Sequence, residues 1–340
     1  MTLYVDVALD SIITYAITVG ASDIHFDPIL NGIQVRLRID GLLTEYMLVD
    51  ATDADMLVNR IKVFSGMDIS EKRLPQDGRW EWSVKSYAVT MRVSSLPSLY
   101  GEAIVCRLMG NEGVHKNLLE LGMDVELQEK IVALLKRPYG LITICGPTGS
   151  GKTATLYAML RMLNLKETKL ICLEDPVEAT IEGAIQIGIN EKIGFTFSKG
   201  LRTVLRQDPD SIMIGEIRDN ETAQLAVKAA LTGHRVITTV HTNTALGVIG
   251  RLVDMGVEPY LLHATLIGSL SQRLVRRIDS TTHSYQGRLG LFEYLEIPFS
   301  DIDWDHVEQY MFTSLQDSAH LAINSGITTL EEVHRAGILL

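Results

Sequence analysis

The sequence lacks the features of a membrane-spanning or exported protein. None of its apolar runs approaches the roughly 20 residues needed to cross a bilayer. Asp6 and Asp10 also stand where a secretory signal would carry basic residues. Together these absences predict a cytoplasmic protein.

Cysteine and positive charge are scarce as well. Cys106, Cys145 and Cys172 each lie in an apolar run without C-x-x-C spacing, which predicts buried, reduced thiols instead of disulfides or a metal site. The 31 basic residues against 42 acidic ones give a net charge of -11. Since phosphate contacts need a basic surface, this balance argues against nucleic acid as the main partner, while leaving room for a local basic patch.

The sequence is organised around residues 141–155. An apolar, β-branched run at 141–145 predicts a buried parallel strand, and a helix is expected at 153–163. The residues between them match the phosphate-loop pattern G-x-x-x-x-G-K-[ST], in which glycines let backbone N–H groups turn toward phosphate oxygens. The nucleotide-binding residues are therefore predicted to be Gly146, Pro147, Thr148, Gly149, Ser150, Gly151, Lys152, Thr153 and Ala154.

The end of this loop predicts the ligands, ATP and Mg²⁺. Lys152 is expected to reach the β- and γ-phosphates, and the hydroxyl of Thr153 is expected to hold Mg²⁺. The N-terminal dipole of the following helix favours the same anion.

From residue 124 onward, strands and helices alternate. This alternation predicts an α/β domain with a mainly parallel sheet covered by helices on both faces. Strands are expected at 141–145, 169–173, 184–189, 211–214 and 235–240, and helices at 153–163, 198–206 and 220–232.

Three of these strands end in groups suited to ATP hydrolysis. Glu174 and Asp175 follow one strand, Glu216 follows a second and His241 follows a third. Ligands of parallel sheets bind at the carboxyl ends of the strands. ATP hydrolysis needs an acid that orients and deprotonates water, an acid behind Mg²⁺ and a polar group that senses the γ-phosphate. A single carboxylate there is often a loop residue or a helix cap, but three such ends beside a phosphate loop favour an ATPase.

Residues 1–109 predict a separate α+β domain, because short strands bounded by turn dipeptides accompany two helices. A turn is expected at 76–79, and a polar, glycine-bearing linker at 110–123. Helices are expected at 5–19 and 53–65, and strands at 23–26, 33–40, 42–49, 80–85, 87–94 and 102–109.

Arg79, Arg92 and Arg107 of this domain allow two interpretations. They could lie on a solvated face of an antiparallel sheet. Alternatively, they could point at an anion held between the two domains, because a guanidinium fork suits phosphate oxygens. The residues alone leave both readings open.

Motifs along the whole chain resemble those of the secretion and pilus-assembly ATPases of the type II secretion and type IV pilus superfamily. In the second domain, EDPVE at 174–178 resembles the aspartate box of that family, and 206–219 resembles its Walker B region. Residues 232–234 and 239–243 resemble its histidine box. In the first domain the matching stretches are GASDIH at 20–25, VRLRIDG at 35–41, QDGR at 76–79 and RVSSLP at 92–97.

The resemblance implies a PAS-like domain at 1–109 and a RecA-like P-loop ATPase domain with a C-terminal helical part at 124–340. It implies that Glu216 is the catalytic base and that Glu174 helps to position water or Mg²⁺. His234 and His241 would sense the γ-phosphate and the neighbouring subunit. The resemblance also favours the reading in which Arg79, Arg92 and Arg107 contact the nucleotide as the first domain closes over the second.

Two features depart from the common family pattern. Gly215 precedes Glu216 where an ordinary Walker B strand ends in Asp-Glu, so the missing Mg²⁺ contact would come through water from Glu174 or Asp175. Residues 276–288 contain no cysteine where many assembly ATPases carry a tetracysteine zinc module, so no zinc is expected.

The chain is compact, starts almost at the PAS-like domain and lacks the zinc module. In these features it most resembles the competence-pilus ATPases of Gram-positive bacteria. The tail at 326–333 resembles assembly motors more than retraction motors. The resemblance implies a cytoplasmic hexamer, peripheral to the membrane through an inner-membrane platform protein. It would hydrolyse MgATP to assemble a type IV-like pilus or pseudopilus for DNA uptake. The acidic net charge predicts that it does not bind nucleic acid itself. A nucleotide-binding scaffold and a retraction motor are the alternatives.

Overall fold

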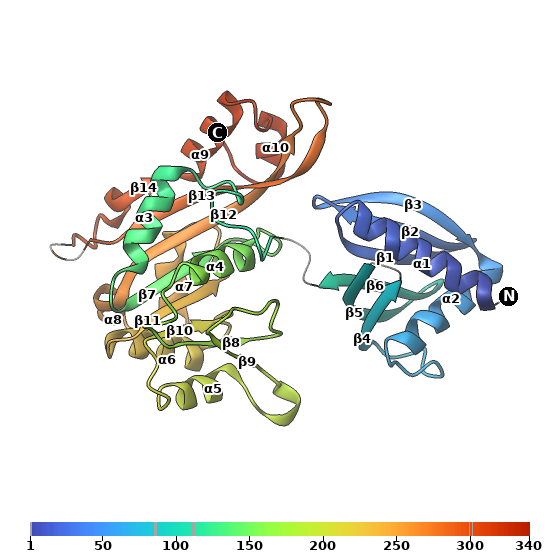
Figure 1. Cartoon of the computed structure of the whole chain (residues 1–340), viewed down its shortest axis with the longest axis horizontal. Helices are drawn as coiled ribbons and strands as arrows, with labels where there is room; N and C mark the ends of the chain where they lie inside the picture. Colours follow the sequence, from blue (N-terminus) through green and yellow to red (C-terminus); the bar gives the residue numbers. More distant parts are fainter. Residues whose placement is uncertain (1, 85–86, 110–112, 299, 301) are drawn as a thin grey trace. The chain divides into compact units, whose positions relative to one another are not determined.

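The chain divides into two compact units, Met1–Glu112 and Gly113–Leu340 (Figure 1). The computed structural model describes residues 2–84, 87–109, 113–298, 300 and 302–340. Residue 85 of the expected strand 80–85 and residues 110–112 of the expected linker lie outside these ranges. The rest of that linker, 113–123, belongs to the second unit, in whose core Leu118, Leu121 and Met123 are buried.

The first unit is an antiparallel sheet with helices on one face. The strand order among the described residues is β3-β2-β1-β6-β5-β4. Alternating side chains such as Ile24 and Met91 pack with Leu9 and Ile61 of the helices in one core. The elements are α1 Thr2–Thr18, β1 Ala21–Ile29, β2 Gly32–Ile39, β3 Leu42–Asp50, α2 Ala51–Phe64, β4 Gln76–Val84, β5 Tyr87–Ser98 and β6 Gly101–Met109.

The turn predicted at 76–79 is wrong, because these residues begin strand β4. Gln76 and Arg79 pair across the ladder with Ser95 and Arg92 of β5. A Cβ atom on Gly78 would come within 2.2 Å of the carbonyl oxygen of Ser65, at the end of α2. Glycine at this position therefore lets a strand pass close to another backbone, and it does not mark a turn.

The second unit is a mainly parallel sheet between layers of helices. Its strand order among the described residues is β14-β13-β12-β7-β11-β10-β8-β9, with β13 and β14 antiparallel to their neighbours. The elements are α3 Val125–Leu135, β7 Gly140–Cys145, α4 Lys152–Arg161, β8 Leu170–Glu174, β9 Ile185–Gly188, α5 Phe197–Val204, β10 Ser211–Ile214, α6 Asn220–Leu231, β11 Arg235–Val240, α7 Gly247–Asp254, α8 Pro259–Thr265, β12 Leu266–Ile278, β13 Tyr285–Glu296, β14 Met311–Thr313, α9 Leu315–Asn324 and α10 Leu330–Arg335, with 3₁₀ turns at Glu191–Ile193 and Val307–Tyr310.

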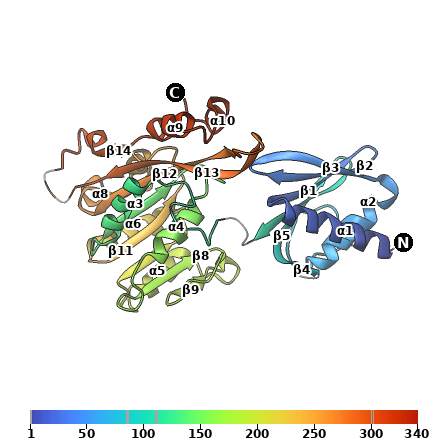
Figure 2. The same ribbon diagram turned by 45° about the horizontal axis from the view of Figure 1, so that its top comes forward.

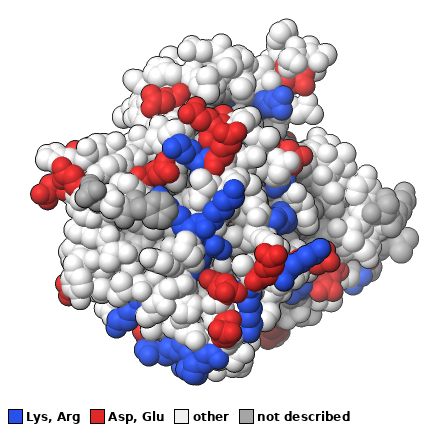
Figure 3. All heavy atoms as spheres, turned by 60° about the vertical axis from the view of Figure 1, so that its left-hand side comes forward, with Lys and Arg blue, Asp and Glu red and all other residues white. Residues whose placement is uncertain are grey.

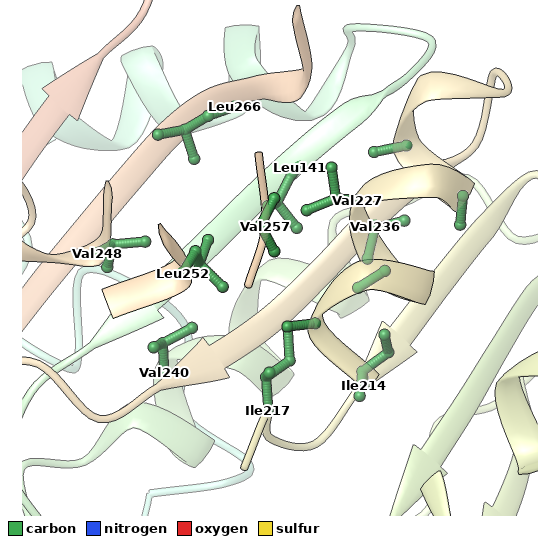
Figure 4. Packing of buried hydrophobic residues seen from close by; sticks show 14 of the residues in the cluster. Leu141, Ile214, Ile217, Val227, Val236, Val240, Val248, Leu252, Val257 and Leu266 are labelled. Carbon is green, nitrogen blue, oxygen red and sulfur yellow. The ribbon is translucent and has the colours of Figure 1, made fainter. Parts of the chain in front are cut away.

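Helices cover this sheet on both faces, as the sequence predicted. Helices α3 and α4 pack on one face, and α5, α6, α7 and α8 pack on the other. Figure 4 shows Leu141, Val236 and Val240 of the strands among side chains of the second layer, including Val227 of α6 and Leu252 of α7. Burial on both faces explains why the strands appear in the sequence as continuous apolar runs.

Both signs of charge are mixed on one face of the molecule (Figure 3). On the face shown in Figure 3, Lys and Arg side chains lie interspersed with Asp and Glu. Within the described ranges, the helices fall short of the length and apolar character that a membrane crossing requires.

Helices α9 and α10 lie along the long β12–β13 hairpin (Figure 2). An ion-pair network fastens α10 there. The Glu332 side chain has no exposed surface and accepts hydrogen bonds from Arg276 of β12 and from Arg335 of its own helix. Burial alone would raise the pKa of Glu332, but the hydrogen bonds from Arg335 and Arg276 outweigh it and lower the pKa to about 2.

We expect Glu332→Gln to lower the free energy of unfolding of the second unit by about 3 kcal/mol, because it leaves two arginines beside a neutral side chain. Chemical denaturation measures this change, with the exposed neighbour Glu331→Gln as control. The folded-state pKa is depressed, so the contribution is complete above the unfolded-state pKa and is lost as the pH falls toward 2. Equal stabilities for the two variants would contradict this account.

Candidate nucleotide-binding and hydrolysis site

A glycine-rich loop connects β7 to α4 at the carboxyl edge of the sheet. Gly146, Gly149 and Gly151 have φ angles of 143°, 78° and 85°, which residues other than glycine rarely adopt. A Cβ atom on Gly146 would lie 2.5 Å from Oγ of Ser150 and 2.6 Å from the carbonyl oxygen of Gln272. Gly146 is therefore required by space as well as by conformation, whereas Gly149, with open space around it, is required by conformation alone.

The polar groups of this loop fit a phosphate anion. The buried Oγ of Ser150 has no hydrogen-bond partner among the described residues. The ammonium of Lys152 donates to the carbonyl oxygens of Gly146 and Pro147, both at 2.9 Å, and to no carboxylate among the described residues. Burial lowers the pKa of Lys152, and the charge of Arg273 acts in the same direction. A phosphate would supply the missing negative charge.

The ends of β11 and β10 lie beside this loop. In the parallel ladder Val240 pairs with Cys145, so His241 starts next to Gly146. The neighbouring strand β10 continues into Glu216, whose Oε2 lies 3.3 Å from Nε2 of His241. The structure therefore brings together the phosphate loop, Glu216 and His241, as the sequence predicted.

Arg218 is a further member of this cluster that the sequence reasoning did not single out. Its Nη2 lies 2.5 Å from Oε1 of Glu216, and this bond raises the pKa of Arg218. Glu216 thus has a cation at one carboxylate oxygen and an imidazole at the other, while 16% of its side chain stays exposed. An ionised carboxylate that is held in place and open to solvent can accept a proton from a bound water molecule.

Glu174 lies at the end of β8, as the sequence predicted, but its side chain is buried. Glu174 is only 4% exposed, and its two carboxylate oxygens accept hydrogen bonds from Tyr157 and Gln186. Burial raises the pKa of Glu174, while those hydrogen bonds act in the opposite direction. The side chain is turned into the protein, and the exposed acid at the end of β8 is Asp175.

His234 lies away from the other site residues. It directly precedes β11, and its carbonyl oxygen accepts a bond from the N–H of Gly140, the first residue of β7. Its Nδ1 lies 3.0 Å from the carbonyl oxygen of Ala229. Because β7 runs from Gly140 to Cys145, roughly 16 Å of strand separate His234 from the phosphate loop. Within one chain, His234 cannot sense a phosphate held by that loop, because His234 lies at the amino-terminal ends of the strands and the loop lies at their carboxyl ends.

Arg79, Arg92 and Arg107 form a row across three strands of the first unit. Arg92 pairs directly with Arg79 on one side and with Arg107 on the other. Their positions alternate with buried residues such as Met91, so the row lies on the sheet face opposite the helices. Arg107 donates to the buried Asp23 at 2.8 Å, whereas Arg79 pairs only loosely with an exposed carboxylate at 3.4 Å. The row is exposed and positively charged, which is compatible with both readings of these arginines.

Arg273 was also missed, although an arginine inside an apolar strand could have indicated it. It lies on β12, the neighbour of β7, and is 8% exposed. Its Nη2 donates to the carbonyl oxygen of Asn243 at 2.7 Å, in the loop that follows His241. Burial lowers the pKa of Arg273. Its guanidinium therefore ties the histidine loop to the strand beside the phosphate loop.

No group of three or more His, Cys, Asp or Glu side chains is placed to hold a metal ion within the part of the chain that the structure describes. The oxygen donors near the phosphate loop instead suit a Mg²⁺ ion that is bound mainly by phosphates and water. Thr153 is exposed at the start of α4, where its hydroxyl could serve such an ion.

The sequence matches the family model described as "Type II/IV secretion system protein" over residues 4–335. The chain belongs to this family. It is 49% identical over 270 residues to the type II secretion system protein E of Klebsiella pneumoniae, covering 79% of this chain and 54% of the relative. It is 40% identical over 372 residues to the type II secretion system ATPase E of Vibrio cholerae, covering 96% and 74%. The chain thus spans about half the length of the Klebsiella pneumoniae relative and three quarters of the Vibrio cholerae relative.

Solved structures of similar proteins share this fold. The pilus retraction motor PilT with bound ADP has a TM-score of 0.68 and 29% identity, covering 96% of this chain and 95% of its own. The ATPase DotB of Legionella pneumophila has a TM-score of 0.77, covering 98% and 96%, and its 23% identity shows the fold alone. These likenesses confirm the RecA-like P-loop fold with an N-terminal α+β part. The relatives named here serve type II secretion, so the narrower resemblance to competence-pilus ATPases gains no support from them.

We expect His241→Ala to slow ATP turnover about tenfold without lowering the melting temperature. Its imidazole contacts Glu216 directly, and 45% of the side chain is exposed, so little packing is lost. Steady-state turnover and a thermal melt check both parts, with the exposed His320→Ala as control. A variant that unfolds would instead assign His241 a structural role.

Proposed function

We propose that this chain hydrolyses MgATP on its second unit and uses the energy as the motor of a type II-like secretion or pilus-assembly machine. The observation that supports this most directly is the position of Glu216 and His241 at strand ends beside the phosphate loop. The family assignment supports the same conclusion, because the relative from Vibrio cholerae is called an ATPase.

In the proposed reaction, the loop 146–153 binds the phosphates through its backbone N–H groups and Lys152. Glu216 accepts a proton from a water molecule, whose oxygen attacks the γ-phosphorus while the bond to the β-phosphate oxygen breaks and ADP leaves. His241 and Arg218 hold the two oxygens of Glu216 in place. When bound, Mg²⁺ would have its charge-neutralising role on the phosphates, with Thr153 proposed to hold it and the exposed Asp175 proposed to act through water.

The arginine row of the first unit is proposed to contact the nucleotide as well. Arg79, Arg92 and Arg107 supply adjacent guanidinium groups on one open sheet face, and such groups match phosphate oxygens. Because nucleotide would then touch both units, its turnover could move one unit relative to the other.

The proposed assembly is a hexamer at the cytoplasmic face of the inner membrane, working through a platform protein. His234, remote from the phosphate loop within one chain, is proposed to face a neighbouring subunit there. Mass measurement of the chain with ATP tests the ring, and addition of the cytoplasmic part of a platform protein tests the coupling. We expect turnover to rise on ring formation and again with that partner. An active ATPase that stays monomeric and ignores the partner would contradict the motor proposal.

A retraction motor is the alternative that a specific observation favours, namely the likeness to PilT across nearly the whole chain. Deletion of the gene separates the two readings, since loss of secretion or of pili indicates an assembly motor, whereas pili that form but do not shorten indicate retraction. The narrower proposal of a competence pilus for DNA uptake predicts loss of transformation in the same strain. A scaffold that binds ATP without turnover would show none of the ATPase activity expected here.

A further inference from the structure

Tyr157 carries a buried hydroxyl group that the proposed reaction does not use. It lies on α4, the helix that begins at the phosphate loop, and its side chain has no exposed surface. Its hydroxyl meets the carboxylate of Glu174, which ends β8. The bond therefore joins the helix of the phosphate loop to the end of β8, directly before the acidic loop 175–179.

The direction of this hydrogen bond is determined by its surroundings. The hydroxyl oxygen of Tyr157 accepts the backbone N–H groups of Glu178 and Ala179, both at 3.2 Å. These bonds occupy the two lone pairs of the oxygen, so its proton is left to donate. The acceptor in reach is Oε2 of Glu174.

Gln186 of β9 holds the other carboxylate oxygen in the same way. Its side-chain carbonyl accepts a hydrogen bond from the N–H of Ile181 at 2.7 Å, and this bond identifies the oxygen and the nitrogen of the amide. Its Nε2 therefore donates to Oε1 of Glu174 at 2.9 Å and to the carbonyl oxygen of Ala179 at 2.8 Å.

These bonds leave Glu174 with both oxygens occupied and its side chain turned inward. The next residue, Asp175, is exposed and lies close enough to Arg218 for the two charges to interact. Arg218 in turn holds Glu216. The buried network around Glu174 thus sets the position of Asp175 relative to Arg218 and Glu216.

We propose that Tyr157, assisted by Gln186, is a positioning residue that fixes Glu174 and the acidic loop 175–179 relative to the phosphate loop. This inference rests on the proposed ATPase function. In this proposal Asp175 is the acid that faces the nucleotide at this strand end, and the buried Glu174 fixes the position of Asp175.

The first test compares wild type with Tyr157→Phe, which removes one oxygen atom and keeps the ring. We expect kcat to fall about 10- to 100-fold, because small misplacements of reacting groups have effects of that size, while KM for ATP changes less than about twofold. Tyr294→Phe is the matched control, since that tyrosine is fully buried and its hydroxyl has no partner among the described residues. Unchanged kcat in Tyr157→Phe, or equal losses in both variants, would overturn the proposal.

A double-mutant cycle tests whether Tyr157 acts through Glu174. In a Glu174→Gln background, Tyr157→Phe should slow turnover by less than about twofold further, because the carboxylate it positions is gone. Independent, multiplying losses would show that Tyr157 acts by another route and would overturn the proposal. If Tyr157→Phe does not fold, Gln186→Leu, at a half-buried position, carries the same expectation.

Hydrogen exchange gives a readout that needs no turnover. The amides of Glu178 and Ala179 bond to the Tyr157 hydroxyl and should exchange about tenfold faster in Tyr157→Phe, without nucleotide, while amides of α6 keep their rates. A wild-type chain that does not hydrolyse MgATP refutes the proposed function, and the exchange rates still decide the positioning role. Exchange unchanged by the substitution would overturn that role even in an active enzyme.

Discussion

Glu216→Gln is expected to lower kcat for ATP about 10²- to 10⁴-fold while the protein still binds nucleotide. The substitution keeps the size of the side chain and removes the group that accepts the proton of water. The amide can still meet Arg218 and His241, which now lie at 2.5 Å and 3.3 Å from the carboxylate oxygens. Single-turnover hydrolysis and the affinity for a fluorescent ATP analogue measure the two parts separately.

The exposed Glu258→Gln serves as the control for this variant, because it removes the same charge at the start of α8, outside the proposed site. It should match the wild type in both measurements. Turnover in Glu216→Gln within a few-fold of the wild type would show that another group is the base. Loss of nucleotide binding would instead assign Glu216 to the binding of the phosphates or of Mg²⁺.

Lys152→Ala is the second variant with a large expected effect. It should weaken ATP binding about 100-fold and leave turnover too slow to measure, since the only side-chain cation of the phosphate-loop sequence is removed. Among the described residues Lys152 donates only to carbonyl oxygens, so its loss leaves no buried carboxylate without a partner. The fold should therefore survive, and titration calorimetry with MgATP measures the loss of affinity.

Lys228→Ala on the exposed side of α6 is the matched control, with an unchanged affinity expected. A Lys152→Ala protein that still binds MgATP as the wild type does would place the nucleotide elsewhere. A lower melting temperature in the absence of ligand would show that Lys152 stabilises the loop itself.

The sequence was informative wherever a local pattern requires one conformation. The strand before the phosphate loop, the loop and α4 follow from their apolar run and their glycines, and the structure places them in that order. The strand ends at Glu216 and His241 could be predicted to meet, because parallel strands align their carboxyl ends at one edge. Here Val240 pairs with Cys145, which puts His241 beside the loop.

Some features could not be predicted because they depend on contacts between distant segments. Gly78 looked like a turn residue, but it is required where β4 passes the carbonyl of Ser65. His234 lies only seven positions before His241 in the sequence, yet the strand between them puts the two at opposite edges of the sheet. The strand expected at 235–240 already separated the two histidines, whereas the resemblance grouped them by motif.

The role of Glu174 depends on side chains that no linear pattern connects. Tyr157 and Gln186 come from a helix and an edge strand on either side of β8, and only the folded sheet brings them to the same carboxylate. A strand-end acid next to a second acid therefore predicted the right place but could not show which of the two faces outward. The position of Asp175 became evident only from the exposure of the two residues.

A crystal structure of the chain with Mg²⁺ and a non-hydrolysable ATP analogue tests the central claim most directly. We predict that the triphosphate lies along residues 146–153 and that the carboxylate of Glu216 reaches the γ-phosphate through one water molecule, with about 2.6–3.2 Å between the carboxylate and that water. A triphosphate bound elsewhere, or a Glu216 too distant for one bridging water, would contradict the account.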